Sequence, residues 1–77
     1  MIHEAIRKVE EWGSMGKFHN EPLVFRKIKD LSDSHLLHII SWIEARPKIY
    51  SEATLQNMKN EQIYRTENYI FVEDYKN

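Results

Sequence analysis

Two histidines, His35 and His38, stand three residues apart in the segment with the clearest helical pattern in the chain. At that spacing the two side chains share one side of a helix, and a pair of imidazoles can bind a transition metal. A metal site needs a third ligand, and the candidates His3, His19 and Glu61 are all remote in the sequence. No His-Glu-x-x-His motif is present. We therefore expect no bound metal, and we expect the histidines to be helix residues with a mild pH sensitivity at about pH 6–7.

The same segment places hydroxyl groups beside an imidazole, at Ser32, Ser34 and His35. A serine nucleophile needs a base that is oriented by a third group, together with donors for the developing oxyanion. The sequence supplies no such set and lacks the Gly-x-Ser-x-Gly turn. Residues 13–16, Gly-Ser-Met-Gly, match neither a P-loop nor a dinucleotide-binding loop. We expect no catalytic residue, no cofactor and no enzymatic activity.

A short basic run, Arg26, Lys27 and Lys29, follows Phe25. Such a run could contact phosphate groups or the acidic surface of a partner. The same charges are typical of an edge strand that is protected against unwanted pairing, and we favour this structural explanation. Binding of a nucleic acid or a nucleotide through this run is the alternative functional hypothesis.

Aromatic residues crowd the last third of the chain, with an arginine among them. Tyrosine and arginine are among the residue types that dominate the binding energy of protein interfaces. A small core also needs aromatic side chains, so we assign Tyr69 and Phe71 mostly to the core. Glu73 and Asp74 would add acidic side chains at the edge of such an interface, near the C-terminus. The residues that we expect to contact a partner protein are Tyr50, Tyr64, Arg65 and Tyr75.

The histidines and serines lie in a central segment where a start signal, a periodic apolar face and a stop signal all predict the same helix. Ser32 is a suitable N-cap, and Leu31 and Leu36 fit a hydrophobic staple around it. Pro47 ends the helix, because the residue before a proline avoids the helical region. The apolar face of this helix consists of Leu36, Ile39, Ile40 and Ile43.

Two further helices are predicted. Residues 2–12 have helical spacing of apolar residues, with Gly13 as the C-cap. A cap at Ser51 begins a helix over residues 52–68, whose apolar residues are sparse and whose Glu61 and Arg65 stand four apart, which adds helix support. The predicted apolar face of the first helix consists of Ile2, Ala5, Ile6, Val9 and Trp12.

Two strands complete the expected fold. Residues 23–29 alternate as a strand, with a bend or bulge near Arg26 and Lys27 where the register breaks. Residues 69–75 form a closing strand, which must pair with the first because a lone strand is not stable. Residues 14–21 form a loop from which Met15 and Phe18 could enter the core. The expected fold is a single α+β domain over residues 1–77, with three short helices and a minimal two-stranded sheet, in the order helix, strand, helix, helix, strand.

Composition narrows the class of protein. The chain has 77 residues, 42% of them apolar and 30% charged, which is typical of one small globular domain. A net charge of −1 disfavours a nucleic-acid binder, which is usually basic. The chain has no cysteine, no apolar run of membrane-spanning length and no secretory signal pattern at its start, so we expect a cytoplasmic protein. A core this small makes homo-oligomerisation worth considering.

Residues 27–40 resemble a class of small, mostly uncharacterised bacteriophage proteins. The shared features are a strand that ends in Asp-Leu-Ser-Asp, a His-Leu pair and a helix with an Ile-Ile pair. A stretch similar to residues 61–67 also occurs in that class. The resemblance implies no catalytic residue. It implies a non-enzymatic accessory protein that binds a host or phage protein in the bacterial cytoplasm, and that inhibits or modulates defence or transcription machinery.

Overall fold

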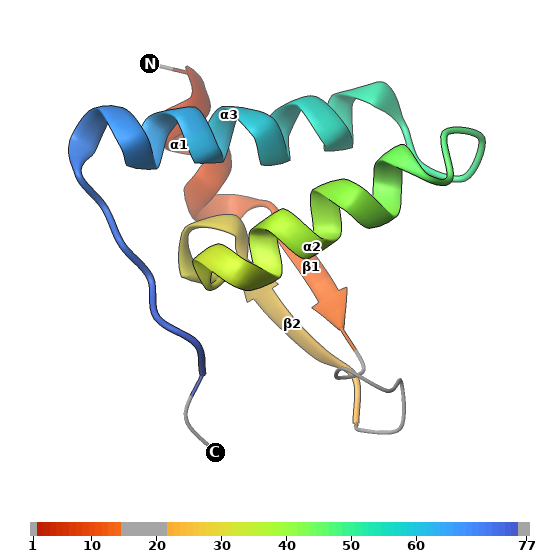
Figure 1. Ribbon diagram of the computed structural model, residues 1–77, viewed down its shortest axis with the longest axis horizontal. Helices are drawn as coiled ribbons and strands as arrows, with labels where there is room; N and C mark the ends of the chain where they lie inside the picture. The colour runs from red at the N-terminus through yellow and green to blue at the C-terminus, as the bar shows by residue number, and fades with distance from the viewer. Residues whose placement is uncertain (1, 15–21, 76–77) are drawn as a thin grey trace.

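The computed structural model describes residues 2–14 and 22–75, which form three helices and a two-stranded antiparallel sheet (Figure 1). The α+β class with three short helices and a minimal sheet is confirmed. The order of the elements differs from the prediction, because both strands precede the second helix. The elements are α1 (Ile2–Val9), β1 (Glu11–Ser14), β2 (Val24–Lys27), the 3₁₀ turn η1 (Ile28–Asp30), α2 (Asp33–Glu44) and α3 (Glu52–Asn68).

Helix α2 forms as the sequence predicts. The Ser32 hydroxyl accepts a hydrogen bond from the backbone N–H of His35 at 3.2 Å, which satisfies one of the free donors of the first turn. Leu31 and Leu36, the two residues of the predicted staple, are both fully buried. Ser51 caps α3 in the same way, through the backbone N–H of Thr54. These contacts are local, which explains why the sequence pattern identifies both helix starts.

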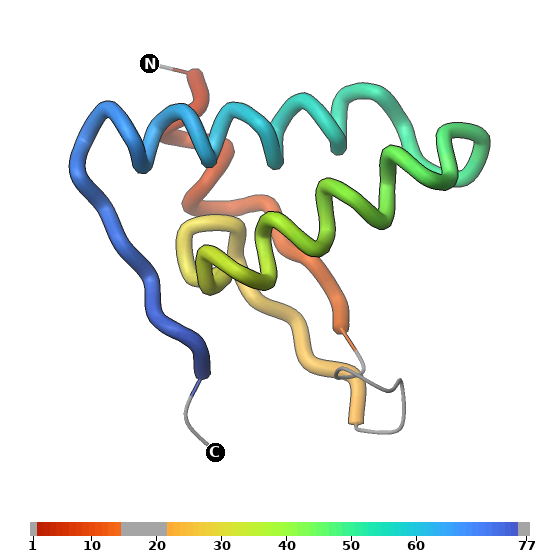
Figure 2. The backbone as a smooth tube through the Cα atoms, viewed as in Figure 1, coloured from red at the N-terminus to blue at the C-terminus, as the bar shows by residue number. Residues whose placement is uncertain are grey.

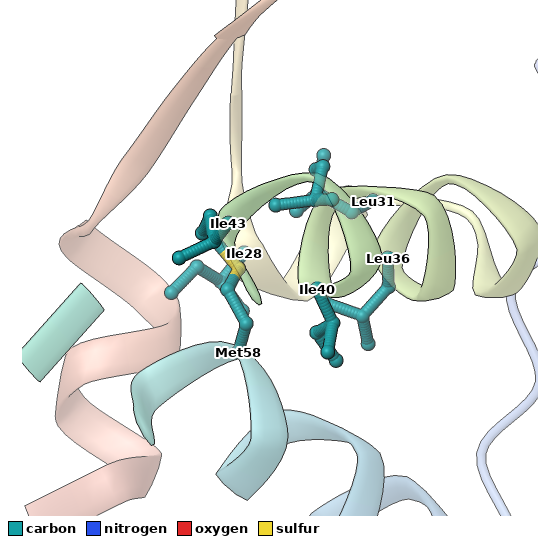
Figure 3. Close-up of a cluster of buried hydrophobic side chains, with 7 residues drawn as sticks. Ile28, Leu31, Leu36, Ile40, Ile43 and Met58 are labelled. Carbon is teal, nitrogen blue, oxygen red and sulfur yellow. The ribbon is translucent and has the colours of Figure 1, made fainter. Parts of the chain in front are cut away.

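The hydrophobic core lies between α2 and α3, with contributions from the segment that precedes α2 (Figure 3). Met58 is the one fully buried apolar residue that α3 contributes among the described residues. Partly buried side chains from α1, β1 and the loop before α3 pack around this cluster. The buried apolar residues are Ile28, Leu31, Leu36, Ile39, Ile40, Ile43 and Met58.

The hairpin β1–β2 corrects the prediction of a helix over residues 2–12. The helix ends at Val9, and Glu11–Ser14 pairs with Val24–Lys27, with Trp12 opposite Arg26. Gly13 is a strand residue and not a C-cap. It lies beneath the Phe25 ring, where an added Cβ would stand only 2.8 Å from a ring carbon. Close cross-strand contact of this kind favours glycine.

The break in register that the sequence predicts near Arg26 and Lys27 marks the end of β2 rather than a bulge. The chain turns directly into η1, which carries Ile28 into the core with no exposed surface. The backbone N–H of Ile28 donates to the carbonyl of Glu10 at 2.9 Å, so the turn also contacts the end of α1.

The predicted closing strand over residues 69–75 does not form. Helix α3 ends at Asn68, and its C-cap, Tyr69, takes a left-handed conformation with φ of 55°. The chain then runs as an extended segment past the start of α2 (Figure 2). One of its contacts there is a hydrogen bond from the Asp33 N–H to the carbonyl of Val72 at 2.9 Å. Alternation of apolar residues does not specify a pairing partner, and β2 pairs with β1 instead.

Two remaining predictions concern the loop and the membrane. Ser14, the first residue of the predicted loop, belongs to β1, and Met15 and Phe18 lie outside the described residues. Within residues 2–14 and 22–75, no helix is both long and apolar enough to span a membrane.

Candidate functional site

A cluster of charged side chains lies in the interior, centred on Glu61, whose side chain has no exposed surface. Arg7 donates to both carboxylate oxygens of Glu61, from Nε at 2.8 Å and from Nη2 at 2.9 Å. Arg65 donates from Nε at 2.8 Å, and Nε2 of His3 lies 2.9 Å from Oε1. We call these residues, together with Asp33, the buried charge cluster.

Arg65 extends the cluster to the start of α2. Its Nη1 donates to the Asp33 carboxylate at 2.7 Å, and its Nη2 donates to the carbonyl of Ile28 at 3.0 Å. The same Asp33 oxygen accepts a longer hydrogen bond, 3.4 Å, from the backbone N–H of Val72. The cluster therefore connects α1, η1, α2, α3 and the C-terminal segment.

The hydrogen bonds to Glu61 decide its charge. Burial by itself raises the pKa of the Glu61 carboxyl, but hydrogen bonds from Arg7, Arg65 and His3 outweigh burial and lower the pKa from 4.5 to about 2. The same hydrogen bond to Glu61 raises the pKa of Arg7. At neutral pH the cluster thus holds the charged Glu61 carboxylate against the guanidinium groups of Arg7 and Arg65, which is the condition under which buried charge is tolerated.

The sequence prediction missed the interior role of this cluster. Helix α1 was expected to bury its apolar side, and Ile6 of that side does pack against the core, but the residues that α1 buries most fully are His3 and Arg7, which stand four residues apart. Glu61 and Arg65 form the pair four residues apart that the sequence indicated, but both side chains are buried, which the sequence did not indicate. The signal was the scarcity of apolar residues on α3, together with two pairs of polar residues at four-residue spacing.

The arrangement favours a structural role for the cluster. Its hydrogen-bonding groups are directed at one another, and both oxygens of the Glu61 carboxylate accept hydrogen bonds from guanidinium groups within the fold. The His3 Nδ1 is buried without a hydrogen-bond partner among the described residues. Surface hollows of about 360 and 490 Å³ adjoin the Asp33 end of the cluster. The first is lined by Asp33, Leu36, Gln62, Arg65, Thr66 and Ile70, and the second by Asp33, Ser34, Phe71, Val72, Glu73 and Asp74.

Two of the expected partner contacts belong to this interior. Arg65 is 4% exposed, so its guanidinium group is not a surface feature. Tyr64 is half-buried, with the guanidinium carbon of Arg7 4.5 Å from the centre of its ring. Tyr64 therefore covers the α1 side of the buried charge cluster.

The other two expected contacts, Tyr50 and Tyr75, are also half-buried. The Tyr50 hydroxyl accepts from the indole N–H of Trp42 at 3.2 Å, and its ring lies 5.6 Å from that of Trp12. The Tyr75 hydroxyl accepts from the backbone N–H of Ser32 at 2.9 Å. Both tyrosines thus make contacts within the fold.

Among the described residues, the two aromatic side chains with the greatest exposure are the two that were assigned to the core. Tyr69 is 96% exposed and Phe71 is 74% exposed, so that assignment is wrong. The reason is the left-handed turn at Tyr69, which ends α3 and directs the chain away from the core instead of into a second strand. Glu73 and Asp74, which are also exposed, follow on the same segment. We call these four residues the tail patch.

The basic run does not gather into a phosphate-binding surface. The guanidinium carbon of Arg26 lies 3.6 Å from the centre of the Tyr75 ring, and Lys29 pairs with the neighbouring Asp30 at 3.0 Å. Lys27 is exposed, but it lies opposite Glu11 in the hairpin and on the other face of the strand from Arg26. The structure therefore places Arg26 and Lys27 on opposite faces of β2, and it pairs Lys29 with an acidic neighbour.

The two histidines of α2 have different surroundings. The Nδ1 of His35 lies 2.8 Å from the Tyr75 hydroxyl, and burial, followed by the charge of Arg26 and by His38, lowers the pKa of His35. His38 is exposed. In the described part of the chain, no three His, Asp or Glu side chains are grouped so that they could hold a metal ion. The Ser34 hydroxyl bonds to Asp74, and Ser32 serves as the cap.

Comparison of the chain with protein-family models, with curated protein sequences and with solved structures finds no match. No activity, substrate or partner can therefore be carried over from a relative. The function is best inferred from the side chains that the fold leaves exposed.

Proposed function

We propose that the chain is a non-enzymatic protein that acts by binding another protein through the tail patch. The observation that carries the proposal is the exposure of Tyr69, 96%, at a backbone position with φ of 55°. A tyrosine at positive φ costs about 1–3 kcal/mol of backbone strain, and such strain is concentrated at functional sites. Exposed aromatic side chains of this kind are the commonest centres of binding energy at protein interfaces.

The backbone around the tail patch is ordered by contacts on both sides of Phe71. On one side the Ile70 N–H donates to the carbonyl of Arg65 at 2.9 Å. On the other side Val72 bonds to Asp33, and Tyr75 bonds to Ser32. A preformed segment loses little conformational freedom on binding, which favours affinity.

The nature of the partner is suggested by charge and by sequence. Glu73 and Asp74 are exposed beside the aromatic residues, and they favour a basic surface on the partner. The resemblance of residues 27–40 to small phage proteins supports a host or phage protein as the partner, met in the bacterial cytoplasm. The proposed effect is inhibition or modulation of a host factor in defence or transcription.

The test is affinity capture from infected and uninfected bacterial cells with the wild-type chain and a Tyr69→Asn/Phe71→Ser variant. Asparagine tolerates a left-handed backbone, so the variant removes the aromatic rings without new strain. The matched control is a Leu37→Ser/Ile49→Ser variant, which removes two exposed apolar side chains outside the tail patch. We expect the wild type and the control to capture the same protein and the tail variant to lose it. Equal capture by all three folded proteins would contradict the proposal.

A further inference from the structure

Helix α1 is partly reversed relative to an ordinary amphipathic surface helix, since only Ile6 of its apolar residues packs against the core. It buries His3 and Arg7, which contact Glu61, and exposes Ile2 at 82% and Val9 at 72%. A surface helix normally buries its apolar stripe and exposes its polar side. The reversal follows from the buried charge cluster, because Glu61 requires donors from the helix that packs against it.

The exposed stripe of α1 consists of Ile2, Ala5 and Val9, which recur at the three- and four-residue spacing of one helix face. Ile2 and Val9 stand about 10 Å apart along the helix axis, with the small Ala5 between them. The stripe is flanked by Glu4 and Lys8, both exposed, whose charged groups lie 3.7 Å apart.

We propose that a second copy of this chain packs against the exposed stripe, with the two α1 helices antiparallel about a twofold axis. This arrangement places Ile2 beside Val9 of the second copy, and Ala5 near the axis lets the helices approach closely. Charge selects the direction. In an antiparallel pair the charged edges of the two stripes lie on the same side of the interface, so that Glu4 of one copy faces Lys8 of the other, whereas in a parallel pair these edges lie on opposite sides and do not meet.

The size of the stripe sets the expected strength of the dimer. A stable interface buries roughly 800 Å² on each partner, which is more than one face of an eight-residue helix provides. The dimer is therefore expected to be weak and to form at concentrations approaching about 1 mM.

The first experiment is sedimentation equilibrium of the whole chain over a concentration series. We expect the mass to rise from the 9.3 kDa of the monomer toward twice that value. Val9→Asp should weaken the dimer by at least about tenfold, because it brings uncompensated carboxylates into the contact. The matched control, Ile63→Asp on the exposed side of α3, should dimerise as the wild type does. A wild-type chain that stays monomeric at about 1 mM overturns the proposal.

A charge exchange tests the antiparallel geometry without removing any apolar contact. Glu4→Lys and Lys8→Glu should each weaken the dimer by about 5–30-fold, because like charges then face each other. A mixture of the two variants should form a heterodimer of about wild-type affinity. Mixing cannot restore the Glu4–Lys8 pair within a helix, so recovery reports contact between copies. No recovery, or a dimer that is unaffected by Val9→Asp, overturns the assignment of this surface. The tail variant should dimerise normally, which keeps this test separate from that of the proposed function.

Discussion

Glu61 is the residue on which the interior depends, because one carboxylate accepts hydrogen bonds from two guanidinium groups and approaches an imidazole. Replacing a buried ion pair with apolar residues can be neutral, but removing one partner leaves the others charged and unpaired. Removing Glu61 alone is therefore expected to lower the free energy of unfolding by more than the ion pairs of Glu61 add to it relative to an apolar interior.

Glu61→Gln should lower the free energy of unfolding by about 3–5 kcal/mol, because Arg7 and Arg65 would lose their shared counter-charge. That is a large part of the roughly 4–12 kcal/mol expected for a chain of this length. Urea denaturation followed by circular dichroism measures the change. The matched control is Glu67→Gln, an exposed residue of the same helix, which should change stability by less than about 0.5 kcal/mol. Equal effects of the two changes would contradict the role of Glu61.

Acid should act through the same residue. The pKa of Glu61 is about 2 in the fold and 4.5 without it, so the folded state binds fewer protons between these values. The stability that comes from this difference, about 3 kcal/mol, is complete above pH 4.5 and is lost as the pH falls toward 2. Urea denaturation of the wild type and Glu61→Gln at pH 7 and at low pH tests this prediction. The wild type should lose more stability than the variant, and equal losses would assign the acid sensitivity to other carboxyl groups.

At the scale of the elements, the helix caps are local features whose effect can be measured. Ser51→Ala should cost about 1 kcal/mol of stability, because the Thr54 N–H loses its acceptor. Ser32→Ala should cost about as much or more, because Ser32 is buried and the His35 N–H would lose its acceptor there. Ser41→Ala, at an exposed interior position of α2, is the control and should be neutral or slightly stabilising. Thermal or urea unfolding of the three variants would show whether the two caps contribute as expected.

The contrast between α2 and α1 explains which elements the sequence predicts. The cap, staple and apolar face of α2 are all encoded within residues 31–43, and the prediction is confirmed. The side of α1 that becomes buried depends on Glu61, which lies more than fifty residues away. Apolar periodicity within α1 carries no information about such a distant partner. The sequence does not predict the hairpin for a related reason. Residues 11 and 12 continue the helical pattern of α1, but in the structure they pair with β2.

The candidate site shows the same division between local and distant information. Aromatic residues in the last third of the chain indicated an interface, but their exposure depends on where α3 ends. A glycine or asparagine would have marked a left-handed C-cap, and Tyr69 gives no such signal. Tyr75, which was expected to be a contact residue, is half-buried because its hydroxyl meets the start of α2. We therefore propose Tyr69 and Phe71 as the contact residues, in place of the Tyr50, Tyr64, Arg65 and Tyr75 that the sequence indicated.

At the scale of the whole molecule, the buried charge cluster adds polar contacts between helices that the small apolar core also joins, and it extends these contacts to the C-terminal segment. Through Glu61 it joins α1 to α3, and through Arg65 and Asp33 it joins α3 to the start of α2 and to Val72. Polar contacts in the interior thus leave apolar side chains outside, on α1 and on the tail patch. The two exposed surfaces are the basis of the two binding proposals.

The most direct test of the proposed function is the affinity of the purified chain for the protein that it captures, measured by titration calorimetry. Tyr69→Asn/Phe71→Ser should weaken binding by about thirtyfold or more, which corresponds to the roughly 2 kcal/mol or more expected at the centre of an interface. Leu37→Ser/Ile49→Ser should bind with the wild-type dissociation constant. An unchanged dissociation constant for the folded tail variant would contradict binding through the tail patch.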